Sequence, residues 1–462
     1  MLRQRSLSII AVILSLAAYL FIAFEVERWQ TTYLFLSLGI LFAFYLLILK
    51  TFNEREILFW ISVAILFRLV FLLAIPSLSD DFYRFIWDGR LLAAGYHPFS
   101  ELPRFYIEHK ISIPGIDNAL FTKLNSPDYF TIYPPVDQFV FWLSAKLFPS
   151  SILGSVLTMR VFVIMAEVGS VLMLKRLLKE YRLPQKNLLL YALNPLVIIE
   201  LTGNLHLESF MIFFLLLSFW LLKDGKFSLS AISFAVAICC KLVPIILLPL
   251  LIARLGWKKS IQYYLLVGIT CLILFFPLLN MEIVSGFTES IGYYFKKFEF
   301  NASIYYLVRE YGFWQYGYNI IQTAGWKLAL WSTMIILVYT FIEGFFSLSI
   351  VGSQRTAAQQ LPISHRSWTI DYGLMTSYLF IFAIYFSFAT IVHPWYISTL
   401  VAFTVFSQHR FAIVWSILIF LTYVGYSVDG FSENHWLIAL EYASVIGYLA
   451  YELVWKREKQ LV

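Results

Sequence analysis

The stretch that decides the fold is residues 57–90, which read ILFWISVAILFRLVFLLAIPSLSDDFYRFIWDGR. Its first part, 57–76, is a continuous apolar run that is long enough to cross a membrane as a helix, and it ends at Pro76. Its second part, Asp80–Arg90, holds three carboxylates and two arginines in a chain that is only 13% charged. The pattern predicts a membrane helix that is followed at once by a charged segment at the membrane surface.

The charged segment is predicted to be a helix that carries acids and a base on one face. At roughly 100° per residue, about one quarter to one third of the circumference holds Asp80, Asp81, Arg84 and Asp88. Ordinary structural roles stay open for all four. Asp80 could cap the helix, Asp81 could interact with the helix dipole, and Arg84 and Asp88 could form a plain surface pair at i,i+4 spacing.

The composition predicts an all-α polytopic membrane protein. The chain has 462 residues, of which 60% are hydrophobic and 19% aromatic, whereas a soluble domain is about 45–50% apolar. The formal net charge is +6, but the basic residues lie in short loops between apolar runs, so no nucleic-acid partner is expected. The three cysteines lie inside apolar runs and show no disulfide or metal-binding spacing.

The distribution of lysine and arginine predicts how the chain lies in the membrane. Arg3 and Arg5 place the N-terminus in the cytoplasm, and the dense basic cluster between Lys175 and Lys186 marks a cytoplasmic loop. Counting apolar runs from there predicts 12–14 transmembrane helices with both termini cytoplasmic. A bacterial inner membrane is the expected location.

The same count predicts one integral membrane domain, residues 1–462, because no soluble segment is long enough to fold alone. Two long loops are expected on the extracytoplasmic side. The first is 77–133, which contains the charged helix, and the second is 281–325. The charged helix is therefore expected to lie outside the cytoplasm, at the head of the first loop.

The unusual polar residues of the chain map to this outer face or its edge. They are Asp80, Asp81, Arg84, Asp88, Arg90, His97, His206, Glu208, Lys241, Arg309 and His393. Charge near a membrane is costly and usually pairs or serves a site, so their convergence predicts a pocket at the membrane surface. Structural roles compete here too: Glu208 could be a first-turn acid, Lys241 could extend to the headgroups, and His393 could belong to an interfacial anchor.

An acid on an outer face, with cations near it and lipid beside it, suits glycosyl transfer from a lipid phosphate. The acceptor alcohol is a poor nucleophile, and a carboxylate within hydrogen-bond reach can take its proton. The leaving group is a polyprenyl phosphate, whose negative charge Arg, Lys or His can stabilise.

The chain resembles the polyprenol-phosphate-mannose-dependent mannosyltransferases of the GT-C fold. The resemblance rests on motifs in a fixed order: Asp81-Phe82-Tyr83-Arg84, Trp87-Asp88-Gly89-Arg90, Gly95-Tyr96-His97-Pro98-Phe99, Tyr133-Pro134-Pro135, Asn194-Pro195, Gly203-Asn204-Leu205-His206-Leu207-Glu208, Phe300-Asn301 and His393-Pro394-Trp395-Tyr396. It implies a GT-C-like fold with a long first extracytoplasmic loop. It also implies inverting transfer of a sugar, usually mannose, from a polyprenyl-monophosphate donor to a glycan, lipid or protein acceptor.

The resemblance also implies roles for residues. Asp81 matches the catalytic base, and Asp80 beside it is the rival for that role. His206, Lys241 and His393 are implied contacts of the donor phosphate or the acceptor, and Glu208 stands where relatives often carry Asp. The other predicted substrate-binding residues are Arg84, Asp88, Arg90, His97 and Arg309. No cofactor is expected, since such families often need no metal and no ligand set here demands one.

Two alternatives stay open at this point. The first is a transporter or flippase for a lipid-linked sugar, which would place paired broken helices in two repeated halves; Lys241-Leu242-Val243-Pro244 is the one such feature. The second is a glycan ligase that uses a diphosphate-linked donor and a divalent metal, for which Asp80, Asp81 and Asp88 could supply some ligands.

Overall fold

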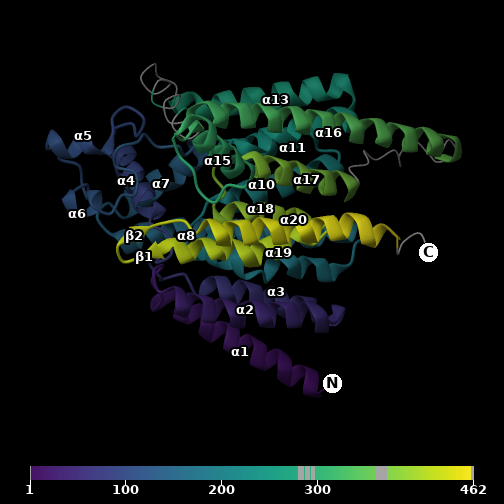
Figure 1. Ribbon diagram of the computed structural model, residues 1–462, viewed down its shortest axis with the longest axis horizontal. Coiled ribbons are helices and arrows are strands. Elements are labelled where there is room, and N and C mark those ends of the chain that lie inside the picture. Colours follow the sequence, from purple (N-terminus) through teal and green to yellow (C-terminus); the bar gives the residue numbers. More distant parts are fainter. Residues whose placement is uncertain (1, 279–285, 287–291, 293–296, 359–371, 459–462) are drawn as a thin grey trace.

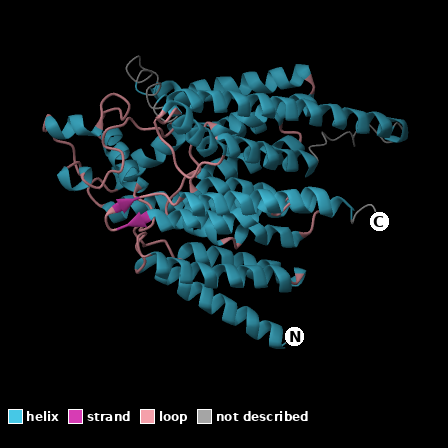
Figure 2. Ribbon diagram, viewed as in Figure 1, coloured by secondary structure: helices cyan, strands magenta, loops and turns pink. Residues whose placement is uncertain are grey.

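The computed structural model of the protein describes residues 2–278, 286, 292, 297–358 and 372–458. Long helices lie side by side and form a bundle (Figure 1). Its main helices are α1 (Leu2–Phe24), α2 (Thr31–Thr51), α3 (Ile57–Leu69), α8 (Ile152–Glu180), α10 (Glu208–Lys223), α11 (Phe227–Cys240), α13 (Trp257–Phe275), α16 (Ile321–Ala358), α17 (Tyr372–Phe388) and α20 (His435–Glu458). The described residues hold one two-stranded sheet, β1 (Tyr426–Ser427) with β2 (Gly430–Phe431), so the chain is all-α as predicted (Figure 2).

A group of short helices caps one end of this bundle. It consists of α4 (Asp81–Ala93), α5 (Pro103–Glu108), α6 (Asn118–Phe121) and α7 (Pro135–Leu147). The first turn of α1 and the last described turn of α20 lie at the opposite end (Figure 1). The two ends of the chain therefore share one side of the bundle, and the charged helix α4 lies on the other side.

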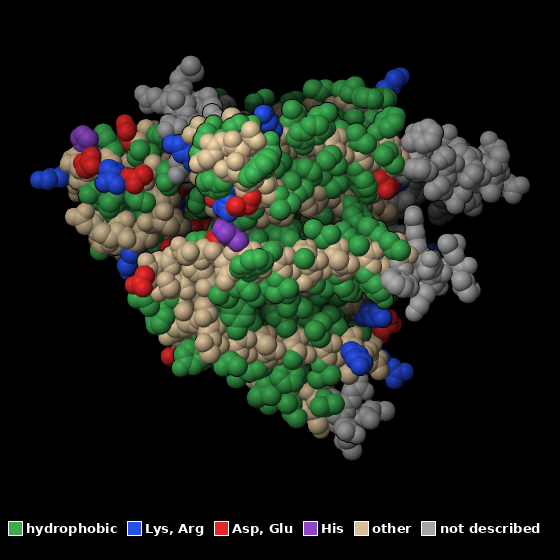
Figure 3. All heavy atoms as spheres, in the orientation of Figure 1, with side chains coloured by type: hydrophobic (Ala, Val, Ile, Leu, Met, Phe, Trp, Pro, Cys, Tyr) green, Lys and Arg blue, Asp and Glu red, His purple; other side chains and the backbone are tan. Residues whose placement is uncertain are grey.

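The flanks of the bundle are apolar. Leu58, Met165 and Phe341 are between 63% and 75% exposed, although their helices belong to the bundle. The visible flank is largely covered by hydrophobic side chains, while charged side chains gather around α4–α6 and at the far ends of the helices (Figure 3). This distribution fits a multi-pass protein whose bundle is surrounded by lipid.

The number of long membrane helices is smaller than the predicted 12–14. Six described helices are long and apolar enough to cross a membrane, and a seventh span results if η3 (Val197–Gly203) and α10, which meet at 110°, are counted as one. Four further apolar helices are only 10–17 residues long. The apolar runs were recognised correctly, but several are broken into shorter pieces that apolarity alone does not reveal.

Two of these breaks lie where polar residues enter the bundle. The run 187–203 folds as η2 (Gln185–Leu188), α9 (Leu189–Ala192) and the π-helical η3. The run 228–253 folds as α11, η4 (Val243–Leu247) and α12 (Leu248–Leu255), which meet next to Lys241 as the sequence predicts. Pro244 cannot continue a regular helix, since it lacks the N–H donor.

The broken ends are held by a buried arginine of α8. The Arg160 side chain is fully buried, and it donates to the carbonyls of Phe71 (2.6 Å) and Ala74 at the end of α3. It also donates to the carbonyls of Thr202 (3.0 Å) and Gly203 (2.9 Å) at the end of η3. These carbonyls lie where regular helices end, so the guanidinium supplies them with hydrogen bonds inside the bundle; that of Phe71 also accepts from the backbone N–H of Ala74 (2.9 Å).

The remaining described elements are shorter helical segments. They are η1 (Glu54–Glu56), η5 (Phe276–Leu278), α15 (Ile304–Tyr316), η7 (Pro394–Tyr396), α18 (Ile397–Thr404), α19 (Phe411–Leu418) and η8 (Ile419–Gly425). Phe300 forms a parallel bridge with Ile391, which joins the second predicted outer loop to the segment before His393. That loop was predicted at 281–325, and most of its residues before 297 lie outside the described residues.

The helices α4 and α7 are packed unusually closely. A Cβ atom on Gly89 would lie 2.2 Å from the carbonyl oxygen of Phe141. The rings of Phe85 and Phe141 stack beside it, with centroids 4.7 Å apart. Only glycine allows this approach, so the two helices behave as one platform.

We expect Gly89→Ala to separate α4 from α7, because the opposing atoms are backbone and cannot rotate away. The free energy of unfolding should fall by about 1–3 kcal/mol, as for other overpacked cores. Thermal unfolding in detergent measures the change. Gly268→Ala in α13 is the matched control, since a Cβ there meets nothing within 4 Å. Equal melting temperatures for the two variants would contradict the close packing.

Candidate active site

The N-terminal end of α4 presents two adjacent carboxylates with different partners. Asp80 precedes the helix and forms an ion pair with Arg28 at 2.9 Å, and its side chain makes no capping hydrogen bond. Asp81 is the first residue of the helix. The Asn125 amide donates to both, at 3.0 Å to Asp80 and 2.6 Å to Asp81. Asp80 is thus neutralised by an arginine, and Asp81 is not.

The partner of Asp81 is His206. Nε2 of His206 lies 3.6 Å from Oδ2 of Asp81, and Nδ1 lies 2.9 Å from the backbone carbonyl oxygen of Glu200. The imidazole also stacks on the indole of Trp395, with centroids 3.5 Å apart. The carbonyl accepts the Nδ1 proton, so Nε2 is the nitrogen that faces the carboxylate. Stacking and hydrogen bond together fix the ring beside Asp81.

The surroundings of Asp81 keep its carboxylate ionised. Burial alone would raise its pKa, but the nearby imidazole of His206 and the hydrogen bond from Asn125 outweigh burial. The pKa of Asp81 therefore lies below its ordinary value of 3.8. A carboxylate that is ionised at neutral pH and only partly exposed can accept a proton from a bound alcohol.

A second charged pair lies beside this one. Glu208, the first residue of α10, forms a salt bridge with Lys241, which follows α11. The Lys241 ammonium also lies 3.8 Å from the ring centroid of Tyr396. Tyr133 lies within electrostatic reach of both Asp81 and Glu208, and these charges add to burial in raising its pKa. The two pairs thus belong to one site.

The imidazole of His393 completes the site. Its ring stacks on Trp395, with centroids 4.3 Å apart, and packs against Phe300. Burial lowers the pKa of His393 to about 3; Asp81 raises it, and His206 and Lys241 lower it. His393 is therefore neutral at physiological pH and can serve as a hydrogen-bonding group.

The structure brings together six of the residues predicted from the sequence. They come from distant segments of the chain and are Asp80, Asp81, His206, Glu208, Lys241 and His393. Among the described residues no group of three or more His, Cys, Asp or Glu side chains is arranged to hold a metal ion. The polar groups of the site are organised by hydrogen bonds, ion pairs and ring stacking.

Arg84 and Asp88 are not part of this site. Their side chains are 3% and 0% exposed and form a 2.8 Å ion pair with each other. Arg84 also donates to the carbonyls of Ser126 and Tyr129, and Asp88 accepts from Gln138. The predicted polar face of α4 exists, but it is turned toward the protein. Instead of contacting substrate, the pair holds the loop that carries Asn125.

Arg90 and His97 also point away from the site. Arg90 is 3% exposed and donates to the Gly115 carbonyl. His97 stacks on Phe99 and accepts from its backbone N–H, and burial lowers the pKa of His97 to about 4. Both residues contact the loop that follows α4 and are not brought together with Asp81, so their predicted substrate-binding role stays a prediction.

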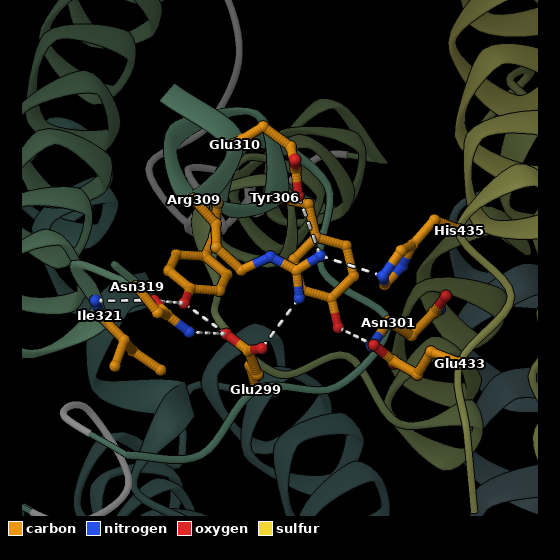
Figure 4. Close-up of polar contacts among 10 residues, drawn as sticks. Glu299, Asn301, Tyr306, Arg309, Glu310, Asn319, Ile321, Glu433 and His435 are labelled. Carbon is orange, nitrogen blue, oxygen red and sulfur yellow. Dashed lines mark hydrogen bonds and ion pairs between the residues drawn. The ribbon is translucent and has the colours of Figure 1, made fainter. Parts of the chain in front are cut away.

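Arg309 belongs to a separate polar cluster (Figure 4). It donates to Glu299 (2.8 Å), to Glu310 (3.2 Å) and to Nε2 of His435 (3.1 Å). Its guanidinium lies 4.3 Å from the ring centroid of Tyr306, whose hydroxyl donates to Glu433. Arg309 therefore ties α15 to the start of α20. Phe300, which contacts His393, lies next to Glu299 in the chain and links this cluster to the site.

Three groups shape the site although the sequence predicts no role in it for any of them. Trp395 is the surface on which both imidazoles stack, and Asn125 joins the two aspartates. Glu200 is fully buried behind His206 and accepts from Tyr423 (2.7 Å) and Asn204 (3.0 Å). A carboxylate inside the apolar run 187–203 was a signal that could have identified Glu200.

The fold and the site define an integral membrane glycosyltransferase. A family model described as alpha-(1->6)-mannopyranosyltransferase, N-terminal domain, matches residues 11–256, which is more than half of the 462-residue chain. The chain belongs to this family of mannosyltransferases, so it uses a sugar donor and an acceptor. The matched segment includes Asp81, His206, Glu208 and Lys241 and ends before His393. No curated protein and no solved structure gives a significant match.

The contact with His206 should be visible in the pH dependence of mannosyl transfer. A depressed pKa keeps Asp81 ionised at neutral pH, so activity that needs the carboxylate is lost only as the pH falls through that low pKa. In His206→Gln the lowering contact is gone while burial remains. The acid limb of the kcat/KM profile should therefore move to higher pH.

His97→Gln is the matched control, because His97 lies in the loop after α4 and contacts Phe99 rather than Asp81. Its acid limb should coincide with that of the wild type. An unchanged acid limb in His206→Gln would show that Asp81 does not depend on this imidazole.

Proposed function

We propose that the protein transfers a mannosyl group from a polyprenyl-monophosphate donor to an acceptor hydroxyl, with Asp81 as the general base. The observation that carries the proposal is that His206, the partner of Asp81, stacks on Trp395, and that the ammonium of the Glu208–Lys241 pair lies over the ring of the next residue, Tyr396. Such a site supplies a base for the acceptor and a cation for the leaving phosphate. The reaction is proposed to take place on the extracytoplasmic side, in accord with the lysine and arginine pattern of the loops.

The transfer step follows from the arrangement of these groups. Asp81 takes the proton of the acceptor hydroxyl while the acceptor oxygen bonds to the anomeric carbon of the donor. The bond between that carbon and the phosphate oxygen breaks, and polyprenyl phosphate leaves with the electron pair. Attack opposite the leaving group inverts the anomeric carbon, so a β-linked donor gives an α-mannoside. The family description supports an α-(1→6) bond, formed on a primary sugar hydroxyl.

Lys241 is proposed to stabilise the leaving phosphate. In the structure its ammonium is paired with Glu208 and lies over the Tyr396 ring. A bound donor would bring an anion of higher charge to the same ammonium, which has three N–H donors. His206 and His393 flank this position and can contribute hydrogen bonds. Asp80 is proposed to support Asp81 through Asn125 rather than to act as the base.

Asp81→Asn should abolish transfer, because the amide keeps the size of the side chain but cannot take a proton. The expected loss in kcat is about 10²–10⁴-fold, the usual contribution of a general base. Asp80→Asn should lose less. The measurement is transfer from radiolabelled polyprenyl-phosphate mannose by the purified protein in detergent.

Asp128→Asn serves as control, because Asp128 is exposed and pairs with Arg104 at 2.7 Å. Retention of near-normal transfer by Asp81→Asn would refute the base assignment. Absence of transfer by the wild type with any polyprenyl-phosphate sugar would instead overturn the donor class.

Substitutions of Lys241 and of Glu208 are expected to affect the KM for the donor differently. Lys241→Gln removes the cation, so the KM for the donor should rise and kcat should fall. Together these changes should lower kcat/KM by a factor of about 10²–10³. Glu208→Gln removes the competing anion, so the KM for the donor should stay equal or fall. Steady-state kinetics with varied donor separates the two effects. A parallel rise of KM in both variants would indicate that the intact pair, and not the lysine alone, is needed.

A further inference from the structure

Asp137 is a buried carboxyl group that the mechanism above does not use. It is the third residue of α7, and its side chain is only 2% exposed. Its Oδ1 atom is enclosed and has no hydrogen-bond partner among the described residues. Burying a carboxyl group without a partner is costly, so such a group in a folded protein calls for an explanation. A ligand that binds to the carboxyl group is one such explanation.

The position of Asp137 is set by the packing of α7, the helix to which it belongs. Gln138 donates to Asp88 of α4 at 3.2 Å, and Phe141 stacks on Phe85 of the same helix. On its other side α7 packs against α11, the helix that leads to Lys241. The platform that carries Asp81 at the start of α4 therefore carries Asp137 as well.

Glu208 and Lys241 lie within electrostatic reach of Asp137, as do the thiols of Cys239 and Cys240 at the end of α11. Burial raises the pKa of Asp137 well above its ordinary value, Glu208 raises it further, and Lys241 lowers it. These surroundings favour the neutral carboxylic acid form of Asp137. It offers one O–H donor and one carbonyl acceptor beside the cation that we assign to the donor phosphate.

This combination matches one kind of group in the donor. A sugar hydroxyl both donates and accepts a hydrogen bond, so it can satisfy both functions of a neutral carboxyl group. A phosphate offers acceptors and negative charge, and it is better matched by Lys241 than by an acid next to Glu208. The sugar is joined directly to the phosphate, so its hydroxyls lie within a few ångströms of it.

We propose that Asp137 binds a hydroxyl group of the mannosyl residue carried by the donor and thereby helps to select the transferred sugar. The inference rests on the proposed function, which places the donor phosphate at Lys241. It adds a sugar-binding residue to a site whose other acids serve the proton and the cation. Recognition by a buried polar group also penalises donors that lack the hydroxyl, because the carboxyl group is then left unpaired.

The test combines protein variants with modified donors. The wild type and Asp137→Ala are assayed with polyprenyl-phosphate mannose and with analogues in which one sugar hydroxyl, at carbon 2, 3, 4 or 6, is replaced by hydrogen. In the wild type, one analogue should lose about 10- to 100-fold in kcat/KM, the effect of one buried hydrogen bond. In Asp137→Ala the same analogue should lose little relative to mannose, because its partner is already absent.

Asp137→Asn and Asp224→Ala provide the controls. The amide of Asn keeps a donor and an acceptor, so this variant should still discriminate against the same analogue. Asp224 is exposed and pairs with Lys226 at 2.8 Å, so its removal should leave all ratios unchanged. Thermal unfolding adds a second readout: removing an unpartnered buried carboxyl should not lower the melting temperature, whereas removing a structural one should.

Three outcomes overturn the inference. One is the same penalty for every analogue in the wild type and in Asp137→Ala. Another is failure of both Asp137→Ala and Asp137→Leu to fold, which would assign the carboxyl group to the structure. The third is absence of transfer by the wild type with any polyprenyl-phosphate sugar, and this result alone also overturns the proposed function.

Discussion

The site depends on one buried arginine that holds two broken helix ends together. Arg160 donates to carbonyls at the end of α3 and at the end of η3. The chain leads from the first end to Asp81 and from the second to His206. A charge in the interior of a membrane protein is costly unless it is well compensated, and carbonyls without helical partners are costly too. The hydrogen bonds between the guanidinium and the carbonyls compensate for both costs. The segments that lead to Asp81 and to His206 can therefore end inside the bundle.

A lysine could not easily replace this arginine. The guanidinium has five N–H donors in a rigid planar fork, and the carbonyls it contacts come from two directions. Arg68 has a similar function nearby, since it joins Glu167 (2.9 Å) to the carbonyls of Ala64 and Ala192. The breaks in the apolar runs are therefore specified by charged residues on neighbouring helices. They are not signs of local weakness.

This coupling explains what the sequence could and could not predict. Apolar runs and basic loops identify a polytopic membrane protein, and the polar residues that interrupt them include Asp81, His206, Lys241 and His393. The sequence cannot tell which polar residues face a ligand and which face each other. Arg84 and Asp88 share a face with Asp81, yet loop carbonyls and Gln138 occupy them. Whether a helical face meets protein or solvent is a tertiary property.

The difference between the predicted spans and the long helices among the described residues has the same origin. A hydropathy count assumes that each apolar run forms one regular helix, but the backbone can be irregular at membrane depth where other side chains satisfy it. The π-helical η3 is such a segment, and it carries Glu200 behind His206. Trp395 stands in one of the motifs, but its role in the site was not predictable for another reason. Its indole stacks on two imidazoles from different segments of the chain. In a chain rich in aromatic residues, no local sequence pattern indicates such a contact.

The charge balance of the site bears on how it could select its donor. Glu208 is paired with Lys241 and Asp80 with Arg28, so an arriving anion meets no unpaired lysine or arginine among these residues. A free phosphate would have to displace Glu208 with electrostatic attraction alone. A lipid-linked sugar phosphate brings additional binding energy from its sugar and its apolar tail, and this energy can be used to open the ion pair. The Glu208–Lys241 ion pair thus favours the proposed lipid-linked sugar phosphate over free phosphate, because the sugar and the apolar tail supply binding energy that compensates for breaking the ion pair.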